Sequence, residues 1–153
     1  MYCAYYKSPV GILEIRANEK AITHVLFSDE QKQENLNACI RECCKQLDEY
    51  FEGKRTTFDL PLQPTGTPFQ EKVWKALCSI PYGETCSYHH IAKLCGNDKA
   101  SRAVGMANNR NPISIIVPCH RVIGASGKMV GYGGGLDKKI FLLELEEAHK
   151  KTQ

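Results

Sequence analysis

The sequence predicts an α/β protein of the α+β class, with a small N-terminal antiparallel sheet and one helix, then a mostly helical C-terminal part containing a helix-turn-helix. Three observations predict it. Residues 2–27 hold short runs rich in β-branched and aromatic residues, apolar residues at helical spacing follow, and residues 56–67 break the pattern with two prolines and a glycine. We therefore expect an N-terminal subdomain over residues 1–66 and a C-terminal subdomain over residues 67–153.

The N-terminal subdomain is expected to begin with three strands, at residues 2–6, 11–17 and 21–27. Ser8-Pro9 and Asn18-Glu19-Lys20 have the composition of turns between them. Residues 31–52 then change to helical spacing, and Gly53 ends this expected helix. Its apolar stripe consists of Leu36, Cys39, Ile40, Cys43, Leu47, Tyr50 and Phe51.

A second helix is expected to open the C-terminal subdomain at Thr67. Thr67 has the residue type of an N-cap, Pro68 suits the first helical position, and Gln70 completes a capping box. The run Pro81-Tyr82-Gly83 stops the helix. Its buried face is expected to consist of Phe69, Val73, Trp74, Leu77 and Ile80.

Two short helices joined by a glycine-containing turn come next and predict a helix-turn-helix. Ser87 is expected to cap residues 88–94, and Asn97 is expected to cap residues 99–108. The second helix is rich in small residues, which allow a close approach to a partner surface. Two interpretations remain open from spacing alone: a DNA-binding helix, and a helix packed tightly in the core.

The run Pro118-Cys119-His120-Arg121-Val122 places a thiol beside an imidazole. It follows the apolar run 113–117, which has the pattern of a buried strand, and precedes a glycine-rich loop over residues 124–135. A thiol so placed suits nucleophilic chemistry, because a neighbouring histidine can help to remove its proton. Chance is the alternative in a chain with eight cysteines. A last helix is expected over residues 136–150, with Glu146 among its charges.

Charge is distributed unevenly along a chain whose formal net charge is +3. Residues 68–135 carry 8 Lys/Arg and 3 Asp/Glu, whereas residues 1–67 carry 8 and 10. This excess favours a polyanionic partner for the C-terminal subdomain, with solvated surface charge as the alternative. No segment has the length and apolarity of a membrane span, and no secretion signal opens the chain, so we expect a cytoplasmic protein, or a nuclear one in a eukaryote. Cys39 and Cys43 share a helix face, but they lack the paired spacing of a zinc site, and no metal is expected.

The C-terminal subdomain closely resembles the O6-alkylguanine-DNA alkyltransferases over about residues 67–147. The motifs occur in the family's order and spacing, whereas the first 66 residues match only loosely. The matching residues are Tyr82-Gly83-Glu84-Thr85, Ser87-Tyr88, Ala103-Val104-Gly105, Asn111-Pro112, Pro118-Cys119-His120-Arg121-Val122, Gly131-Tyr132, Gly134-Gly135-Leu136 and Leu142-Leu143-Glu144-Leu145-Glu146.

The resemblance implies a role for each catalytic candidate. Cys119 is implied as the alkyl acceptor, His120 as the group that removes its proton through a bound water, and Glu146 as the carboxylate that orients His120. Asn111 is implied to fix the water and the loop. Tyr88 is implied to donate a proton to N3 of guanine, where negative charge develops as the O6–alkyl bond breaks.

The resemblance also assigns the DNA contacts. The second helix of the helix-turn-helix is expected in the minor groove, with Arg102 filling the gap left by a flipped nucleotide. The small residues beside it are expected to form the close-approach surface; they are Ala100, Ser101, Ala103 and Gly105. The base pocket is expected to include Val122, Tyr132 and Gly133, with the carbonyls of Cys119 and Val122 accepting from the guanine amino group.

The implied function is direct reversal of alkylation damage in double-stranded DNA. The alkyl group moves from O6 of guanine, and with less support from O4 of thymine, to Cys119 in a single turnover without cofactor or metal, on a monomeric protein. One alternative is a non-catalytic protein that binds alkylated bases; such relatives lack the acceptor cysteine that this chain keeps. Another is a Cys-His hydrolase, which needs neither a basic helix-turn-helix nor Tyr88. Two departures from the family pattern, Gly133 and residues 106–110, affect the contacts to O6 and to DNA.

Overall fold

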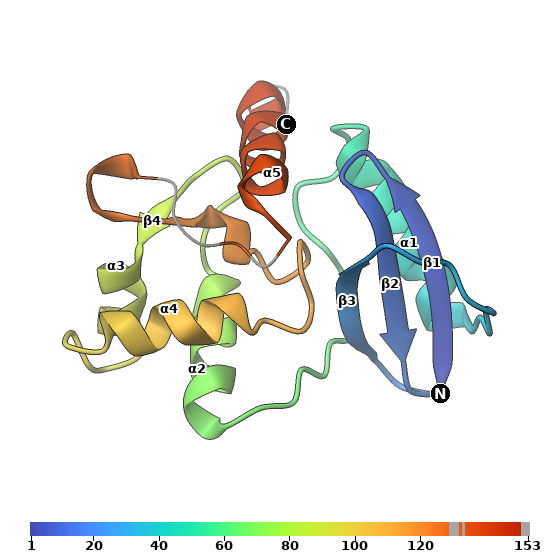
Figure 1. Cartoon of the computed structure of the whole chain (residues 1–153), viewed down its shortest axis with the longest axis horizontal. Coiled ribbons are helices and arrows are strands. Elements are labelled where there is room, and N and C mark those ends of the chain that lie inside the picture. The colour runs from blue at the N-terminus through green and yellow to red at the C-terminus, as the bar shows by residue number, and fades with distance from the viewer. Residues whose placement is uncertain (129–131, 133, 151–153) are drawn as a thin grey trace.

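A three-stranded antiparallel sheet forms the N-terminal part of the computed structural model, which describes residues 1–128, 132 and 134–150. Its strands are β1 (Tyr2–Ser8), β2 (Gly11–Ala17) and β3 (Ile22–Ser28), in the order β1-β2-β3 (Figure 1). Tyr2 pairs with Ala17 and Ile12 with Ser28. Inward residues such as Leu13 and Ile15 are fully buried, as the alternation of a half-buried sheet requires. The predicted sheet is confirmed.

Helix α1 (Ala38–Phe51) covers the sheet, but it begins seven residues later than predicted. The cause lies outside the helix, because Asn35 exchanges two backbone hydrogen bonds with Cys3 at the edge of the sheet (2.8 and 2.9 Å). Asn37 is the N-cap, and its side chain accepts from the backbone N–H of Ile40. Leu36 therefore precedes the helix and is 39% exposed.

The C-terminal part holds four helices around the short parallel pair β4 (Cys86–Ser87) and β5 (Val122–Ile123). The helices are α2 (Pro68–Leu77), α3 (Tyr88–Leu94), α4 (Ser101–Asn109) and α5 (Leu136–His149). The capping box at Thr67 and the cap at Ser87 form as predicted. Helix α4 begins two residues later than predicted, because Asn97 accepts from the backbone of Lys99 within the turn and does not cap the helix.

The apolar run Ile113–Val117 was predicted as a strand, and this prediction is wrong. The run is a buried turn in which Ile115 has φ +73°, a left-handed conformation that is rare for a β-branched residue. An isolated bridge joins it to the sheet: the Ser114 N–H donates to the Val25 carbonyl (3.0 Å), and the Val25 N–H donates to the carbonyl of Pro112, just before the run (2.9 Å). The turn leads into a 3₁₀ helix, Cys119–Arg121.

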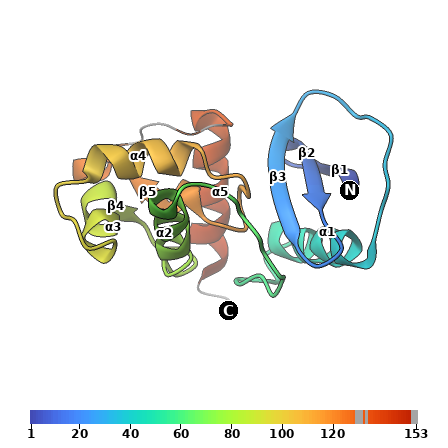
Figure 2. The same cartoon turned by 90° about the horizontal axis from the view of Figure 1, so that it is seen from below.

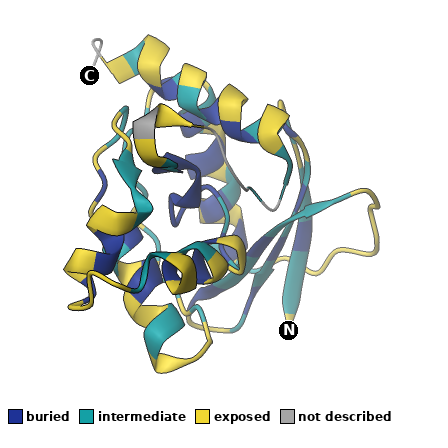
Figure 3. Cartoon of the chain, turned by 60° about the vertical axis from the view of Figure 1, so that its left-hand side comes forward, coloured by how far each residue is buried: buried dark blue, intermediate teal, exposed yellow. Residues whose placement is uncertain are grey.

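Both parts of the chain contribute to one continuous core. Buried side chains of the sheet and α1 join those of α2, α3, α4 and α5 in a single apolar cluster. Helix α5 lies between the other C-terminal helices and the sheet (Figure 2), and exposed residues lie on the outer faces of the helices and in the connecting loops (Figure 3). Among the residues described, no helix has both the length and the apolar character to cross a membrane.

Candidate active site and DNA-binding surface

Cys119 is the first residue of the 3₁₀ helix and is only 4% exposed. Its backbone N–H donates to the Val117 carbonyl (2.8 Å), which closes the tight turn before it. Burial raises the pKa of the Cys119 thiol, and the Asn111 amide, the Lys139 charge and the nearby Tyr132 hydroxyl counter this only in part. The resting thiol is therefore protonated, and its reaction as a nucleophile requires a base.

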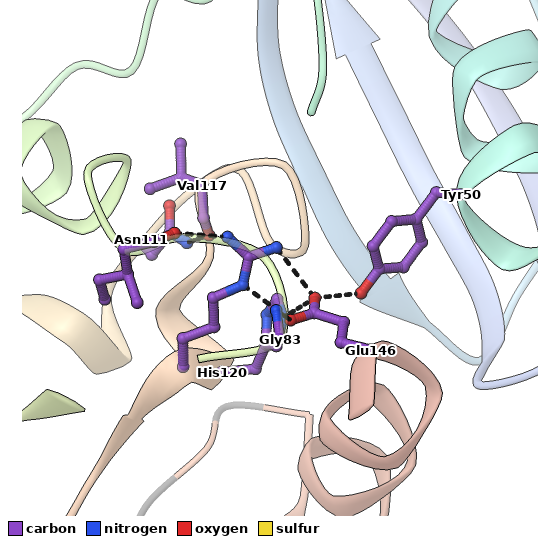
Figure 4. A network of polar contacts seen from close by, with 8 residues as sticks. Tyr50, Gly83, Asn111, Val117, His120 and Glu146 are labelled. Carbon is purple, nitrogen blue, oxygen red and sulfur yellow. Dashed lines mark hydrogen bonds and ion pairs between the residues drawn. The ribbon is translucent and has the colours of Figure 1, made fainter. Parts of the chain in front are cut away.

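Asn111 holds the buried turn that delivers Cys119. Its Nδ2 donates to the Val117 carbonyl (2.8 Å) and to the Ile113 carbonyl (3.3 Å), while its Oδ1 accepts from the Ile113 N–H (3.0 Å). These bonds satisfy backbone groups that a strand would have paired with a neighbour (Figure 4). The amide of Asn111 thus fixes both ends of the turn.

His120 and Glu146 form a pair in which both residues are buried. His120 Nε2 lies 2.7 Å from Glu146 Oε2. Burial lowers the pKa of His120, and Glu146 opposes this shift. The hydrogen bond to an ionised Glu146 assigns the proton of neutral His120 to Nε2, so that Nδ1 is left as an acceptor. Nδ1 has no hydrogen-bond partner within residues 1–128, 132 and 134–150.

Glu146 accepts hydrogen bonds from four of the residues that the structure describes. Besides His120, its donors are Arg121 Nε and Nη2 (2.8 and 3.0 Å), the Tyr50 hydroxyl (2.6 Å) and the Gly83 N–H (3.3 Å) (Figure 4). Burial alone would raise the pKa of Glu146, but the bonds and charges of His120 and Arg121 outweigh it and lower that pKa to about 2. Glu146 is therefore ionised throughout the physiological range, as a buried partner of His120.

Tyr88 opens helix α3 and packs against helix α4. A Cβ atom added at Gly105 would lie 3.9 Å from the Tyr88 ring, so the two helices approach closely at this point. Burial raises the pKa of Tyr88, and the nearby Cys119 raises it further. The Tyr88 hydroxyl is therefore a protonated donor beside the thiol.

The predicted DNA contacts lie along α4 and at its N-cap, Ala100, and Gly105 among them faces the Tyr88 ring of α3. Arg102 and Ala103 are exposed, and Ala100, Ser101 and Gly105 are half-buried. Inward side chains of the same helix, Val104 and Ala107, belong to the core. The helix therefore fits both interpretations of its small residues. Its inner side packs in the core, and its outer side presents small side chains to solvent, as a DNA-binding helix would.

The predicted base pocket is described only in part. The Val122 carbonyl accepts from Lys139 Nζ (2.6 Å), and the Cys119 carbonyl accepts from Asn108 Nδ2 (3.3 Å). The Cys119 carbonyl also accepts from the Val122 N–H, so both of its lone pairs have a donor among the described residues. The Tyr132 hydroxyl is buried near Cys119 without a well-formed hydrogen bond among the described residues. Gly133 lies outside the described residues.

The cysteines outside the site show no metal centre in the described part of the chain, where no three His, Cys, Asp or Glu side chains gather as ligands. All eight cysteines are free thiols. Cys39 and Cys43 instead contribute to the packing of α1, and burial raises the pKa of both.

Two family models match nearly the whole chain. The DNA binding domain of 6-O-methylguanine DNA methyltransferase matches residues 68–148, and the ribonuclease-like domain of the same family matches residues 1–64. The chain belongs to the 6-O-methylguanine DNA methyltransferase family.

Individual members of this methyltransferase family are similar over their full length. The methylated-DNA–protein-cysteine methyltransferase of Methanosarcina mazei is 54% identical, with 99% of this chain and 100% of the relative covered. The protein of the same name from Mycobacterium leprae is 48% identical, with 96% and 93% covered. The crystal structure of Mycobacterium tuberculosis OGT in complex with DNA superposes with a TM-score of 0.91 at 45% identity, covering 97% of this chain and 94% of the other.

Two residues of this methyltransferase-family site were missed by sequence reasoning. Arg121 is buried with its guanidinium on Glu146 and on the Ile80 carbonyl (2.7 Å). Its place directly after the Cys-His pair could have suggested a buried partner, because a buried arginine needs a carboxylate. Tyr50 was assigned only to the apolar stripe of α1, although a buried tyrosine hydroxyl also needs a hydrogen-bond partner.

Proposed function

We propose that this chain repairs DNA by moving an alkyl group from O6 of guanine to Sγ of Cys119. The observation that carries this proposal is the buried His120–Glu146 pair: Nδ1 of His120 has no partner in the described part of the chain, and the preceding residue, Cys119, is a thiol that is protonated at rest. A nucleophile, a base and an orienting carboxylate are the parts that an activated thiol requires. Family membership supplies the substrate class.

Recognition is assigned to helix α4. O6 of a stacked guanine is out of reach of a buried thiol, so the nucleotide must leave the helix. In this proposal α4 enters the minor groove, the half-buried Ala100, Ser101 and Gly105 with the exposed Ala103 allow close approach, and Arg102 fills the gap in the stack. The extruded base then meets the carbonyls of Cys119 and Val122, with Tyr132 and Gly133 closing the pocket.

The transfer step conserves atoms and charge. The thiol proton passes to Nδ1 of His120 through a water, and the thiolate attacks the carbon attached to O6. The S–C bond forms as the C–O bond breaks, and its electron pair stays on the guanine. Tyr88 donates its proton to N3, which neutralises this charge. The proton held by His120 then returns to the Tyr88 oxygen through solvent, so no net charge remains. Asn111 keeps the turn in place.

The product is a thioether on Cys119, which has no easy leaving group, so each molecule acts once. The chemistry assigned to these residues uses no cofactor or metal. O4-alkylthymine has less support as a substrate in this proposal, because thymine has no amino group for the carbonyls of Cys119 and Val122. We propose that the protein works where the DNA is, in the cytoplasm or in the nucleus of a eukaryote. We also propose that it acts as a monomer.

We further propose that residues 1–66 and 67–153 are distinct subdomains with different tasks. The separate matches of two family models, to residues 1–64 and 68–148, support this division. The second subdomain holds the thiol and the DNA-binding helix, while the first supports the site from behind.

Mass spectrometry of the intact protein after incubation with an O6-methylguanine duplex tests the function. We expect a gain of one methyl group per chain, mapped to Cys119, and no gain in Cys119→Ala, which should still bind the duplex. Cys3→Ala is the matched control, because Cys3 is a free, half-buried thiol on the outer strand β1 of the N-terminal sheet, and this variant should still gain the group. Tight lesion binding without a change in mass would instead support a non-catalytic binder of alkylated bases.

A further inference from the structure

We propose that Tyr50 is a positioning residue of the alkyl-transfer site, whose hydroxyl holds Glu146 and moderates the attraction of that carboxylate for the proton on His120. This inference rests on the proposed function. It also gives the N-terminal subdomain a part in the chemistry, because Tyr50 lies on α1 and Glu146 lies on α5, 96 residues further along the chain.

The geometry of the contact is that of a strong hydrogen bond. The Tyr50 hydroxyl lies 2.6 Å from Glu146 Oε2, and both side chains are fully buried. This Oε2 is the same atom that faces His120 Nε2 at 2.7 Å (Figure 4). Hydrogen bonds to charged groups are shorter and about twice as strong as neutral ones, and exclusion of water strengthens them further.

The ring of Tyr50 is fixed by other aromatic rings, so the hydroxyl has little freedom to move. Phe51 packs edge-on at 5.2 Å between ring centroids, Phe58 lies tilted at 5.4 Å, and Tyr82 packs edge-on at 6.3 Å. All three contacts involve the ring alone. Replacing Tyr50 with phenylalanine would therefore keep the packing and remove only the donor.

The hydroxyl acts as a permanent donor. Burial raises the pKa of Tyr50 well above its ordinary value, and the charge of Glu146 raises it further, so the proton stays on Tyr50. A donor on Oε2 draws negative charge away from His120. Without it, the carboxylate would remain oriented by both Arg121 bonds and by Gly83, but its charge would favour a protonated His120 more strongly.

We call the buried, hydrogen-bonded group of His120, Glu146, Arg121 and Tyr50 the relay. The other ionisable groups around it do not hide the expected change in the His120 pKa. Arg121 and Lys139 are the positive charges that face His120, and both disfavour its protonation. Tyr82 and Tyr132 face Glu146 with pKa values raised by burial, and the pKa of Glu146 itself is about 2. Between pH 5 and 8, a change in the acid limb of the reaction is therefore assigned to His120.

Tyr50→Phe tests the inference through a pH profile. We expect the His120 pKa to rise by up to about one unit, because one hydrogen bond to the charged partner is lost. His120 must be neutral to accept the thiol proton, so the acid limb of single-turnover transfer from an O6-methylguanine duplex should move up by the same amount. At a pH below the limb, this is a rate loss of up to about tenfold.

The matched control is Tyr6→Phe. The Tyr6 hydroxyl also donates a hydrogen bond to a carboxylate, Asp48 on α1 (2.5 Å), but Asp48 is not part of the relay. The same atom is thus removed from the same subdomain, and the acid limb should stay at its wild-type position. An equal shift in both variants would overturn the inference, because it would mean that any loosening of α1 has this effect.

A second readout separates this inference from the proposed function. Titration of the His120 ring by NMR on the free protein, assigned with a His120→Gln variant, needs no transfer activity. A raised His120 pKa in Tyr50→Phe supports the inference even if the wild-type protein transfers no methyl group, an outcome that would refute the proposed function alone. An unchanged His120 titration and an unchanged acid limb would refute the inference while leaving the function standing.

Discussion

The relay around Glu146 and the outer face of α4 differ in almost every physical respect. The relay is buried, charged and joined by hydrogen bonds from three segments of the chain, whereas the α4 face is exposed, carries Arg102 and is formed by small side chains. The buried relay is shielded from solvent, which suits the transfer of a proton, whereas the α4 face is open to solvent, which suits the binding of DNA. Substitutions in the relay should therefore affect both folding and chemistry, and those on the α4 face should affect DNA binding alone.

The largest effect is expected from Glu146→Gln. The variant leaves the Arg121 guanidinium and His120 without their buried negative partner, and removing one member of a buried pair costs about 3 kcal/mol or more of stability. We also expect transfer to slow by about 100-fold or more, because imidazolium is no longer stabilised. Thermal unfolding and single-turnover kinetics measure the two effects.

Glu147→Gln provides the control for that comparison. Glu147 neighbours Glu146 on α5, but it pairs with Lys150 on the surface (2.7 Å), where an ion pair contributes about 0–1 kcal/mol. Both its stability and its transfer rate should stay near wild type. A transfer rate for Glu146→Gln as high as that of Glu147→Gln would remove Glu146 from the relay.

A smaller and more selective effect is expected from Arg102→Ala. Arg102 is exposed on α4, so its loss should leave stability within about 0.5 kcal/mol of wild type. Repair of duplex O6-methylguanine should slow by about tenfold, since a stacking and charge contact is worth roughly 1–3 kcal/mol. Reaction with free O6-benzylguanine should not change, because no nucleotide has to be extruded. Equal losses with both substrates would contradict the stack-filling role.

The two regions were also predictable from the sequence to different degrees. The caps at Thr67 and Ser87 follow from residues within one helical turn, and the structure has both. The candidates Cys119 and His120 came from their place side by side in the sequence, Glu146 was implied by the family resemblance, and the structure brings His120 and Glu146 into contact. Capping residues and apolar spacing thus predicted most of the helices and strands, and the family resemblance predicted the central residues of the site.

Some errors have a partner that is distant in the sequence, and others come from local side-chain hydrogen bonds that the apolar pattern does not show. Residues 31–37 were expected to be helical, but Asn35 pairs with Cys3 at the sheet. The run Ile113–Val117 has the composition of a strand, and the bonds from Asn111 make it a turn. Tyr50 could not be assigned to the relay because its partner is 96 residues away. Apolar patterns predict burial, but they do not identify the group that satisfies a buried polar atom.

The response of stability to acid also sharpens the contrast between the two regions. The pKa of His120 is lowered by burial, so the folded state loses stability as the pH falls below about 6.5, the ordinary value for histidine. The pKa of Glu146 is about 2 instead of the ordinary 4.5, so its contribution is present above pH 4.5 and is lost between pH 4.5 and 2. Denaturant unfolding at a series of pH values should therefore show stability falling in two stages. Arg102→Ala should keep both stages, because Arg102 lies outside the relay, whereas Glu146→Gln should lose the lower one. A lower stage of wild-type size in Glu146→Gln would mean that other carboxylates, and not the relay, govern acid unfolding.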